Sequence, residues 1–463
     1  MYPGALLAQE ACSYQAMTQM LMWMRGRLTV LIHSDRDCSN VLPKTGGRIH
    51  SDQGYKFLCT NLREDEIVTG QGNAKLRRAI ELVTEAYHPD LLVILSTCPT
   101  VMIGDNIKQV ARKAAKDLGV RISAELTHGL KPKSPAEIVD DCYTMLCRSA
   151  AEPQHLERAR RVNLVGVNLD DFEQLEIEQG LAQLGLTLNV VLSERADLSA
   201  FLRVADAGYN IHPGPNMLLE FDKLCAERWQ MTAIEVPLPV GVRASDRFWQ
   251  AIAQATASET PIAGHPLAQS RAQAVAAITE FETGPFAQAR DEHNRTPRCA
   301  YNVGSVRSFD LRRIALEELG DLPFFEELGF DCALFIQGPL DAGNIERTRG
   351  VLSQMGVEHP FVIFPDPGGL ARWLRPGDFD VFFGADFLRD QLTKLNLPLL
   401  NHRQLGIGYA AVIGNLALVN TALTTRFYDH FAATPPPAVS QPPSGRLRPP
   451  AQRGPHVRRT DAR

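Results

Sequence analysis

Three cysteines in the amino-terminal third of the chain are the residues whose type and setting could support metal chemistry. Cys12 stands near the start, Cys38 comes just past an apolar run that begins at Leu28, and Cys98 ends an apolar run that begins at Leu91. Apolar runs of this length are typical of buried parallel strands, and open α/β sheets place ligands at the carboxyl ends of such strands. We therefore expect two of the three thiols at strand tips, where soft thiolate ligands could hold an iron–sulfur cluster.

The spacing of these thiols is too wide for a zinc finger or a ferredoxin loop, both of which use tight Cys-x-x-Cys runs. On spacing alone they would more often be ordinary buried thiols, since free cysteine is among the most buried residue types. The other cysteines lie in apolar, strand-like or helix-like settings and are predicted to be inert core thiols: Cys59, Cys142, Cys147, Cys225, Cys299 and Cys332.

Longer segments around the thiols resemble a known family. The sequence Ser-Thr-Cys that ends at Cys98, followed by Ile-Gly-Asp-Asn-Ile from Ile103, resembles the third cluster-ligand segment of nitrogenase component 1 subunits. The stretch Thr60–Gly72 resembles the part of that family between its second and third ligands. Cys12 and Cys38 fall where the first and second ligands belong. Order and spacing of all three motifs therefore agree with this family.

The resemblance implies a cofactor and partners. A cubane cluster needs four protein ligands, so three thiolates from one chain cannot complete it; the family places its cluster between two homologous subunits. By resemblance, Cys12, Cys38 and Cys98 are this chain's ligands to a P-cluster-like [8Fe-7S] centre, with [4Fe-4S] as the alternative. The expected partners are an α-type subunit, in an α2β2 heterotetramer, and a separate iron protein that hydrolyses ATP. The segment 70–72 lacks the Lys and Ser/Thr of a phosphate-binding loop, so this chain is not expected to bind ATP.

The resemblance also indicates which subunit type this is. The family's α-type subunit holds the substrate-reducing cofactor through a cysteine in mid-chain and a histidine near the end. Here the middle position is His212 followed by a proline, with no neighbouring cysteine, and the stretch 405–409 has no histidine, although His402 lies close by. The chain is thus similar to a β-type subunit that relays electrons and has no catalytic residue of its own. His212 and His402 are predicted to be structural or interface residues.

Two departures from the family bear on the substrate. The lead into the second ligand, Gly-rich in the family, is here the polar and charged segment 33–37, and the long amino-terminal arm of the molybdenum enzyme's β subunit is absent. These departures favour a nitrogenase-like reductase, and we take reductive carbon–sulfur cleavage by a methylthio-alkane reductase as the leading interpretation. The alternatives are a dinitrogen-reducing nitrogenase β subunit, a non-catalytic scaffold for nitrogenase cofactor assembly, and a tetrapyrrole reductase subunit.

Length and pattern predict the architecture. A chain of 463 residues is too long for one core and suggests about three domains. Alternating strand and helix patterns predict an α/β fold with doubly wound parallel sheets, and the segments 236–248 and 380–384 also resemble the family, which uses three Rossmann-like units. The predicted organisation is a cluster-ligand domain at 1–158, a middle domain at 159–298, a C-terminal domain at 299–432 and a disordered Pro/Arg-rich tail at 433–463.

The predicted elements follow the apolar runs. Strands are expected at 28–33, 56–60, 91–96, 121–125, 162–168, 186–192, 299–303, 332–336, 361–364, 381–383 and 398–400. Helices are expected at 72–87, 104–118, 218–228 and 406–431, with another ending near 184. In the second of these, Gly104-Asp105 is the expected amino end, because a carboxylate there favours the helix dipole.

Charge and hydropathy exclude two classes of partner. The formal net charge of −5 requires no basic surface, so no nucleic-acid partner is expected. No apolar run approaches the roughly 20 residues that cross a bilayer, so no membrane association is expected. Nine cysteines scattered without a disulfide framework suit a reducing compartment, and we expect the protein in the cytoplasm.

Overall fold

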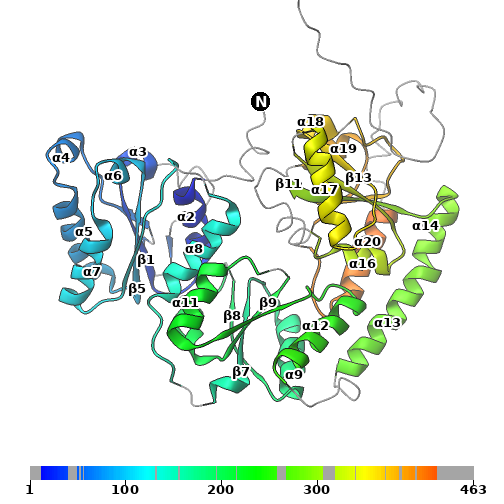
Figure 1. The fold of residues 1–463 in the computed structure, drawn as a ribbon, viewed down its shortest axis with the longest axis horizontal. Helices are drawn as coiled ribbons and strands as arrows, with labels where there is room; N and C mark the ends of the chain where they lie inside the picture. Colours follow the sequence, from blue (N-terminus) through cyan, green and yellow to red (C-terminus); the bar gives the residue numbers. More distant parts are fainter. Residues whose placement is uncertain are drawn as a thin grey trace, which may run out of the picture.

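Three parallel sheets follow one another along the chain, and Figure 1 shows the middle one between the other two. The computed structural model describes residues 12–39, 50–51, 54–55, 57–130, 133–154, 157–193, 195–214, 216–257, 267–305, 319–338, 340–370, 372–384, 388–401 and 404–424. The predicted tail at 433–463 and His402 lie outside these residues. The α/β class with several parallel sheets agrees with the prediction from the sequence.

The N-terminal sheet carries the segments that hold the three candidate thiols. Its strands are all parallel, in the order β4 (Phe57–Cys59), β1 (Leu28–His33), β5 (Leu91–Ser96) and β6 (Ile122–Glu125). Helices α5 (Gly72–Tyr87) and α7 (Ile107–Leu118) pack on one face, and α2 (Ser13–Trp23) and α8 (Pro135–Cys147) on the other. Because both faces are covered, every residue of β1 and β5 is buried, which explains their unbroken apolar runs.

The middle sheet shares a hydrophobic core with the N-terminal one. Its parallel strands lie in the order β10 (Thr232–Val236), β9 (Tyr209–Pro213), β7 (Arg161–Val165) and β8 (Thr187–Leu192). Residues of α2 and α8 pack in one cluster with residues of α10 (Leu198–Leu202), α11 (Leu219–Trp229), β7 and β8. The two sheets are therefore joined through buried helices, which fixes the N-terminal sheet against the middle one.

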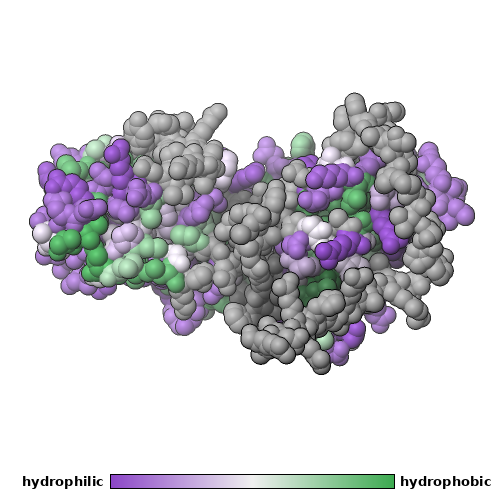
Figure 2. Space-filling model, turned by 90° about the horizontal axis from the view of Figure 1, so that it is seen from above, coloured by the Kyte–Doolittle hydropathy of each residue, from purple (hydrophilic) through white to green (hydrophobic). Residues whose placement is uncertain are grey.

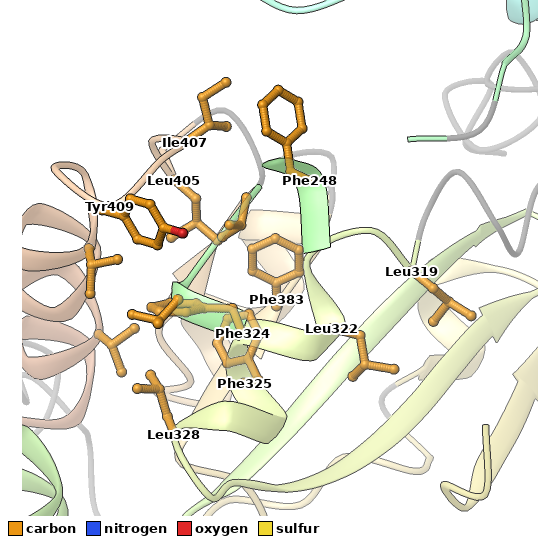
Figure 3. Close-up of a cluster of buried hydrophobic side chains, with 14 of the residues drawn as sticks. Phe248, Leu319, Leu322, Phe324, Phe325, Leu328, Phe383, Leu405, Ile407 and Tyr409 are labelled. Atoms are coloured by element: carbon orange, nitrogen blue, oxygen red, sulfur yellow. The ribbon is translucent and has the colours of Figure 1, made fainter. Parts of the chain in front are cut away.

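The C-terminal sheet has five parallel strands, in the order β13 (Phe361–Phe364), β12 (Asp331–Gln337), β11 (Arg298–Ser305), β14 (Val381–Phe383) and β15 (Leu399–Leu400). Its core continues into the middle unit, and Figure 3 shows Phe248 in the same buried cluster as Phe383, Phe324 and Tyr409. The helices of the middle and C-terminal units not yet named include α9 (Asp171–Gln183), α12 (Val242–Ala255), α13 (Leu267–Thr283), α14 (Pro285–His293), α17 (Ala342–Gln354) and α20 (Val412–Thr424).

Short elements complete the described part of the chain: α3 (Arg36–Ser39), β2 (His50–Ser51), β3 (Gly54–Tyr55), α4 (Glu64–Val68), α6 (Cys98–Met102), η2 (Arg158–Arg160), η3 (Val204–Asp206), α16 (Leu322–Glu327), α18 (Pro367–Leu370) and α19 (Arg389–Lys394). No helix among the described residues is long and apolar enough to cross a membrane.

Buried carboxylates hold helix starts at the junctions between units. Asp140, on α8, accepts the backbone N–H groups of Glu220 and Phe221 at the start of α11, both at 2.9 Å. Glu327, at the end of α16, accepts two N–H groups in the first turn of α12, at 2.9 and 3.1 Å. The N–H groups in the first turn of a helix have no hydrogen-bond acceptors inside the helix. Each carboxylate accepts hydrogen bonds from two of these groups and interacts favourably with the positive end of the helix dipole.

Observed and predicted elements differ mainly at helix starts. Four predicted strands and the helix at 72–87 agree with the structure to the residue. The helix predicted from Gly104 instead begins at Ile107, because Asn106 caps it by accepting the N–H of Gln109 at 3.2 Å, while Asp105 turns away to His33. The helix predicted at 406–431 begins at Val412, and residues beyond 424 lie outside the described part of the chain.

Asp321 should make the stability of the protein depend on pH. This side chain is 6% exposed, and burial raises its pKa from the ordinary 3.8 to about 7. Because the pKa is higher in the folded state, the folded protein binds more protons, and the stability from this group is lost as the pH rises from about 4 to about 7. Asp321→Asn stays neutral at every pH. The free energy of unfolding of this variant, relative to that of wild type, should therefore increase by on the order of 3 kcal/mol as the pH rises across that range.

Urea unfolding at a series of pH values measures this difference. Asp291→Asn is the matched control, because its side chain is 78% exposed and should show no comparable trend. A difference between Asp321→Asn and wild type that is the same at every pH would contradict the prediction.

Candidate metal centre

The three predicted thiols lie at one edge of the N-terminal sheet. Strands β1 and β5 are neighbours with His33 opposite Ser96, so their carboxyl ends meet. Cys38 follows β1 within α3, Cys98 is the first residue of α6 after β5, and Cys12 directly precedes α2. All three are free thiols and half-buried, so they are neither core residues nor fully in solvent.

Gly129, in the loop after β6, marks where the thiols approach one another. A Cβ atom on this exposed glycine would lie 3.6 Å from the Cys12 sulfur and 3.9 Å from the Cys98 sulfur. Its backbone N–H donates to the Cys98 sulfur at 3.2 Å. Burial raises the pKa of the Cys38 thiol, and the negative charges of Asp35, Cys98 and Cys12 raise it further. The structure thus brings Cys12 and Cys98 together at Gly129 and places Cys38 at the same sheet edge.

Hydrogen bonds fix the segment of Cys12 to the loop of Gly129. The hydroxyl of Ser13 donates to the carbonyl of His128 and accepts its N–H, both at 2.9 Å. Thr127 is in turn tied to Ser96 at the tip of β5, where its N–H donates to the Ser96 hydroxyl at 2.9 Å and its own hydroxyl donates to the Ser96 carbonyl at 2.5 Å. Cys12 is thereby positioned by contacts more than 100 residues away in sequence.

A buried histidine links the strands beneath the site. His33, the last residue of β1, is fully buried, with Nε2 at 3.0 Å from Asp105 and Nδ1 at 3.1 Å from the Thr60 hydroxyl. Burial lowers the pKa of His33, while the hydrogen bond to Asp105 and its charge raise it. Gly72 makes room for this carboxylate, since a Cβ there would lie 2.1 Å from the Asp105 oxygen. Gly72, the first residue of α5, therefore serves packing.

The donor set fits a multi-iron cluster better than a single ion. Among the residues that the structure describes, no three or more His, Cys, Asp or Glu side chains are arranged to hold one metal ion. A multi-iron cluster takes its thiolates on separate iron atoms, so its ligands need not converge on one point. Two half-buried thiols beside Gly129 and a third at the same sheet edge suit that requirement. Coordination would displace the thiol protons.

Cys59 is a fourth thiol near the site that sequence reasoning placed in the core. It is half-buried at the carboxyl end of β4, accepts the N–H of Asn61 at 3.2 Å, and lies 3.5 Å from the Asp35 carbonyl. Its position opposite Ile32 of β1 puts it at the same sheet edge. The signal for this was its place at a strand end, the same argument that selected Cys98. The remaining five cysteines are buried, as predicted.

His212, one of the two histidines considered from the sequence, lies in the middle sheet, away from this site. His212 is buried in β9, with Nε2 at 2.9 Å from an oxygen of Asp222. Asp222 also accepts hydrogen bonds from Asn210 and Asn216, at 2.9 and 2.5 Å, so His212 belongs to a buried polar cluster. His402 lies outside the described residues.

Comparison with known proteins agrees with this geometry. The chain is 43% identical over 65 residues to the nitrogenase molybdenum-iron protein alpha chain of Methanosarcina barkeri, covering 14% of this chain and 12% of that one. It is 32% identical over 169 residues to the nitrogenase iron-molybdenum cofactor biosynthesis protein NifE of Methanococcus maripaludis, covering 35% and 34%. The matches thus span at most about a third of these two relatives.

The fold and a family model extend the likeness along the chain. A solved structure, "Nitrogenase Cp1 at pH 6.5", superposes with a TM-score of 0.66 at 17% identity, covering 94% of this chain and 92% of that one, which shows a common fold. The family model described as "Nitrogenase component 1 type Oxidoreductase" matches residues 14–290. Since this match covers more than half of the chain, the protein belongs to the nitrogenase component 1 type oxidoreductase family.

Proposed function

We propose that this chain is a subunit of a cytoplasmic, nitrogenase-like two-component reductase and that it supplies Cys12, Cys38 and Cys98 to an iron–sulfur centre shared with a homologous subunit. The observation that carries the proposal is the approach of the Cys12 and Cys98 sulfurs to Gly129, with Cys38 in the loop after β1 at the same sheet edge. Three thiolates leave a cubane short of ligands, and in this proposal a second chain completes it. The centre would be P-cluster-like, with a four-iron cluster as the alternative.

The residues of this chain would position the thiolates and set their surroundings. When bound, the cluster would supply one-electron transfer. The N–H of Gly129 would donate to the Cys98 thiolate, and Tyr14, whose hydroxyl donates to the Cys38 carbonyl at 3.3 Å, would hold the loop of Cys38. Hydrogen bonds to sulfur and partial burial are the means by which a protein adjusts such a centre.

Exposed apolar side chains beside the site support a partner subunit there. Met102 and Ile103 end α6 and are 72% and 40% exposed; Leu126 and Leu130 flank the Gly129 loop and are 42% and 55% exposed. Figure 2 shows hydrophobic residues among hydrophilic ones on the surface of this unit, at the left of the view. Contiguous exposed apolar surface marks interaction sites. The proposed assembly is an α2β2 heterotetramer served by an ATP-dependent iron protein.

The β-type role rests on the middle and late segments of the chain. His212 is engaged with Asp222, and the glycines of the stretch 405–409 are packed against carboxylates of α9, where Cβ atoms on Gly406 and Gly408 would lie 2.8 and 2.6 Å from Glu173 and Glu176. Such a loop supports an electron-relaying subunit that leaves the substrate-reducing cofactor to its partner. For the substrate we propose a methylthio-alkane, because of the polar and charged lead at 33–37.

A scaffold for cofactor assembly is the second candidate. The match to NifE, at 32% identity over 169 residues, favours it. A scaffold and a reductase subunit both present thiolates to a cluster, so geometry alone does not separate them. Turnover does.

Purifying the chain with its homologous subunit and counting iron tests the proposal. We expect several iron atoms per subunit pair and, with the iron protein and MgATP, release of methanethiol or a hydrocarbon from methylthio compounds. Ammonia from dinitrogen would instead identify a nitrogenase. Iron without turnover of either substrate would favour the scaffold. A complex that contains no iron would overturn the proposed function.

A further inference from the structure

The short helix α6, which begins at Cys98, depends on polar contacts for its position. It has five residues, all of them described, and only Thr100 among them is buried. Its last residue, Met102, is 72% exposed. A helix this short is not stable by itself, and among its described residues no apolar side chain is buried to hold it in place. The direction of the Cys98 side chain therefore depends on the hydrogen bonds that fix α6.

Two hydroxyl groups attach the start and the middle of α6 to the end of β1. The Thr97 hydroxyl donates to Ser34 Oγ at 2.7 Å. The Thr100 hydroxyl shares its proton between the carbonyls of His33 and Thr97, both at 3.1 Å. All four residues are at most 1% exposed. Because His33 ends β1 and Ser34 follows it, these contacts join the segment of Cys98 to the segment that leads to Cys38.

His33 also holds the segment that leaves α6. Asp105 lies three residues beyond the helix, and its carboxylate is 3.0 Å from Nε2 of His33, with the two side chains 5% and 0% exposed. An ionised carboxylate has no proton to donate, so the Nε2–H of His33 is the donor. The backbone N–H of Asp105 donates to the Thr100 carbonyl at 3.1 Å. His33 thus contacts α6 through its carbonyl and the segment after α6 through its ring.

The position of His33 is itself fixed. Its strand β1 lies between β4 and β5 in a sheet that is covered on both faces. Nδ1 of His33 lies 3.1 Å from the Thr60 hydroxyl, which also accepts the N–H of Ser34 at 3.1 Å. A ring that contacts neighbours through both of its nitrogens has little freedom to turn. His33 is therefore a rigid point from which α6 can be held.

We propose that His33 is a positioning residue for the iron–sulfur centre, which holds α6 and the segment after it and so fixes the Cys98 sulfur relative to the loop of Cys38. This role rests on the proposed function. It assigns to His33 no contact with the cluster, since the residue acts through α6.

Loss of the His33 ring should weaken the hold of the site on its iron. Leucine at this position would leave Asp105 without its donor in an apolar setting, so the carboxylate should turn toward solvent and move the end of α6 with it. Cys98 would then need to be ordered when the cluster binds. Loss of a residue that orients a metal ligand typically costs about 10–100-fold in metal affinity. We therefore expect a ferrous-iron chelator to remove iron from the His33→Leu complex on the order of tenfold faster or more.

The test measures iron removal by the chelator and the electron paramagnetic resonance spectrum of the reduced complex, without oxygen. For His33→Leu we expect faster removal and changed g values, because Cys98 holds its iron in a different orientation. His33→Gln should restore most of both properties, since its amide N–H can reach the position of Nε2 and donate to Asp105. Asp105→Ala removes the same hydrogen bond from the other side and should resemble His33→Leu, including the case in which His33→Leu does not fold.

His212→Leu is the matched control. His212 is also a buried histidine of a central strand, with Nε2 at 2.9 Å from a carboxylate oxygen of Asp222, but it lies in the middle sheet. The change should cost stability and leave iron removal and g values as in wild type.

Four outcomes decide the role of His33. Wild-type removal rates and g values in His33→Leu or Asp105→Ala would overturn it. Equal acceleration in His33→Leu and His212→Leu would also overturn it, because the effect would then be general loosening. The same is true if His33→Gln behaves like His33→Leu. These three results leave the proposed function intact, whereas a wild-type complex without iron would overturn the proposed function and this role with it.

Discussion

Replacing Cys38 by alanine is expected to remove most of the iron from the complex while the three sheets stay folded. Cys38 is half-buried in the loop after β1, whose end lies beside the end of β5 that leads to Cys98, so it is the third donor of the proposed centre. Its side chain packs only at the margin of the core. Losing a thiolate from a site with three should therefore cost cluster binding far more than folding.

Iron per subunit pair and the far-ultraviolet circular dichroism spectrum measure the two parts of this expectation. Cys332→Ala is the control, because Cys332 is a buried thiol of β12 far along the chain and should cost stability without costing iron. We expect the Cys38→Ala complex to hold less than half of the wild-type iron. Full iron in Cys38→Ala, or equal losses in both variants, would remove Cys38 from the ligand set.

The strands were predictable because their cause is local. β1 and β5 are continuous apolar runs, since sheets covered on both faces bury every side chain, and such runs can be recognised without knowing what covers them. The start of α7 was not predictable in the same way. Gly104-Asp105 has the composition of a helix start, yet Asp105 is drawn to His33, a partner 72 residues earlier in the chain. A tertiary contact decided that boundary.

In the candidate site, too, features set by local sequence were predictable and features set by tertiary contacts were not. Cys38 and Cys98 could be placed at strand ends from the sequence, because the two strands are themselves visible there. Gly129 could not, since nothing in its neighbourhood indicates that β6 would bring its loop beside Cys12 and Cys98. Cys59 was assigned to the core, although a short strand ending beside β1 puts it near the site.

Replacing Glu176 by alanine is expected to lower the free energy of unfolding by about 3–5 kcal/mol. This carboxylate on α9 is 4% exposed and accepts the backbone N–H groups of Tyr409 and Ala410, both at 2.7 Å. Alanine would leave both N–H groups without this partner, at a cost of roughly 1–3 kcal/mol each. It would also open the space that Gly408 leaves for the carboxylate, where a Cβ would lie 2.6 Å from its oxygen.

Because α9 and the loop at 406–410 belong to units far apart in sequence, the loss should loosen the junction between the middle and C-terminal sheets. Tryptophan fluorescence during urea unfolding can report it, since Trp249 packs directly against α9 at Gly180. Glu178→Ala is the matched control: the same change, on the same helix, at an exposed residue that hydrogen-bonds to Gln174. We expect the control to stay within about 0.5 kcal/mol of wild type. Equal unfolding midpoints for the two variants would mean that the buried carboxylate does not join the two units.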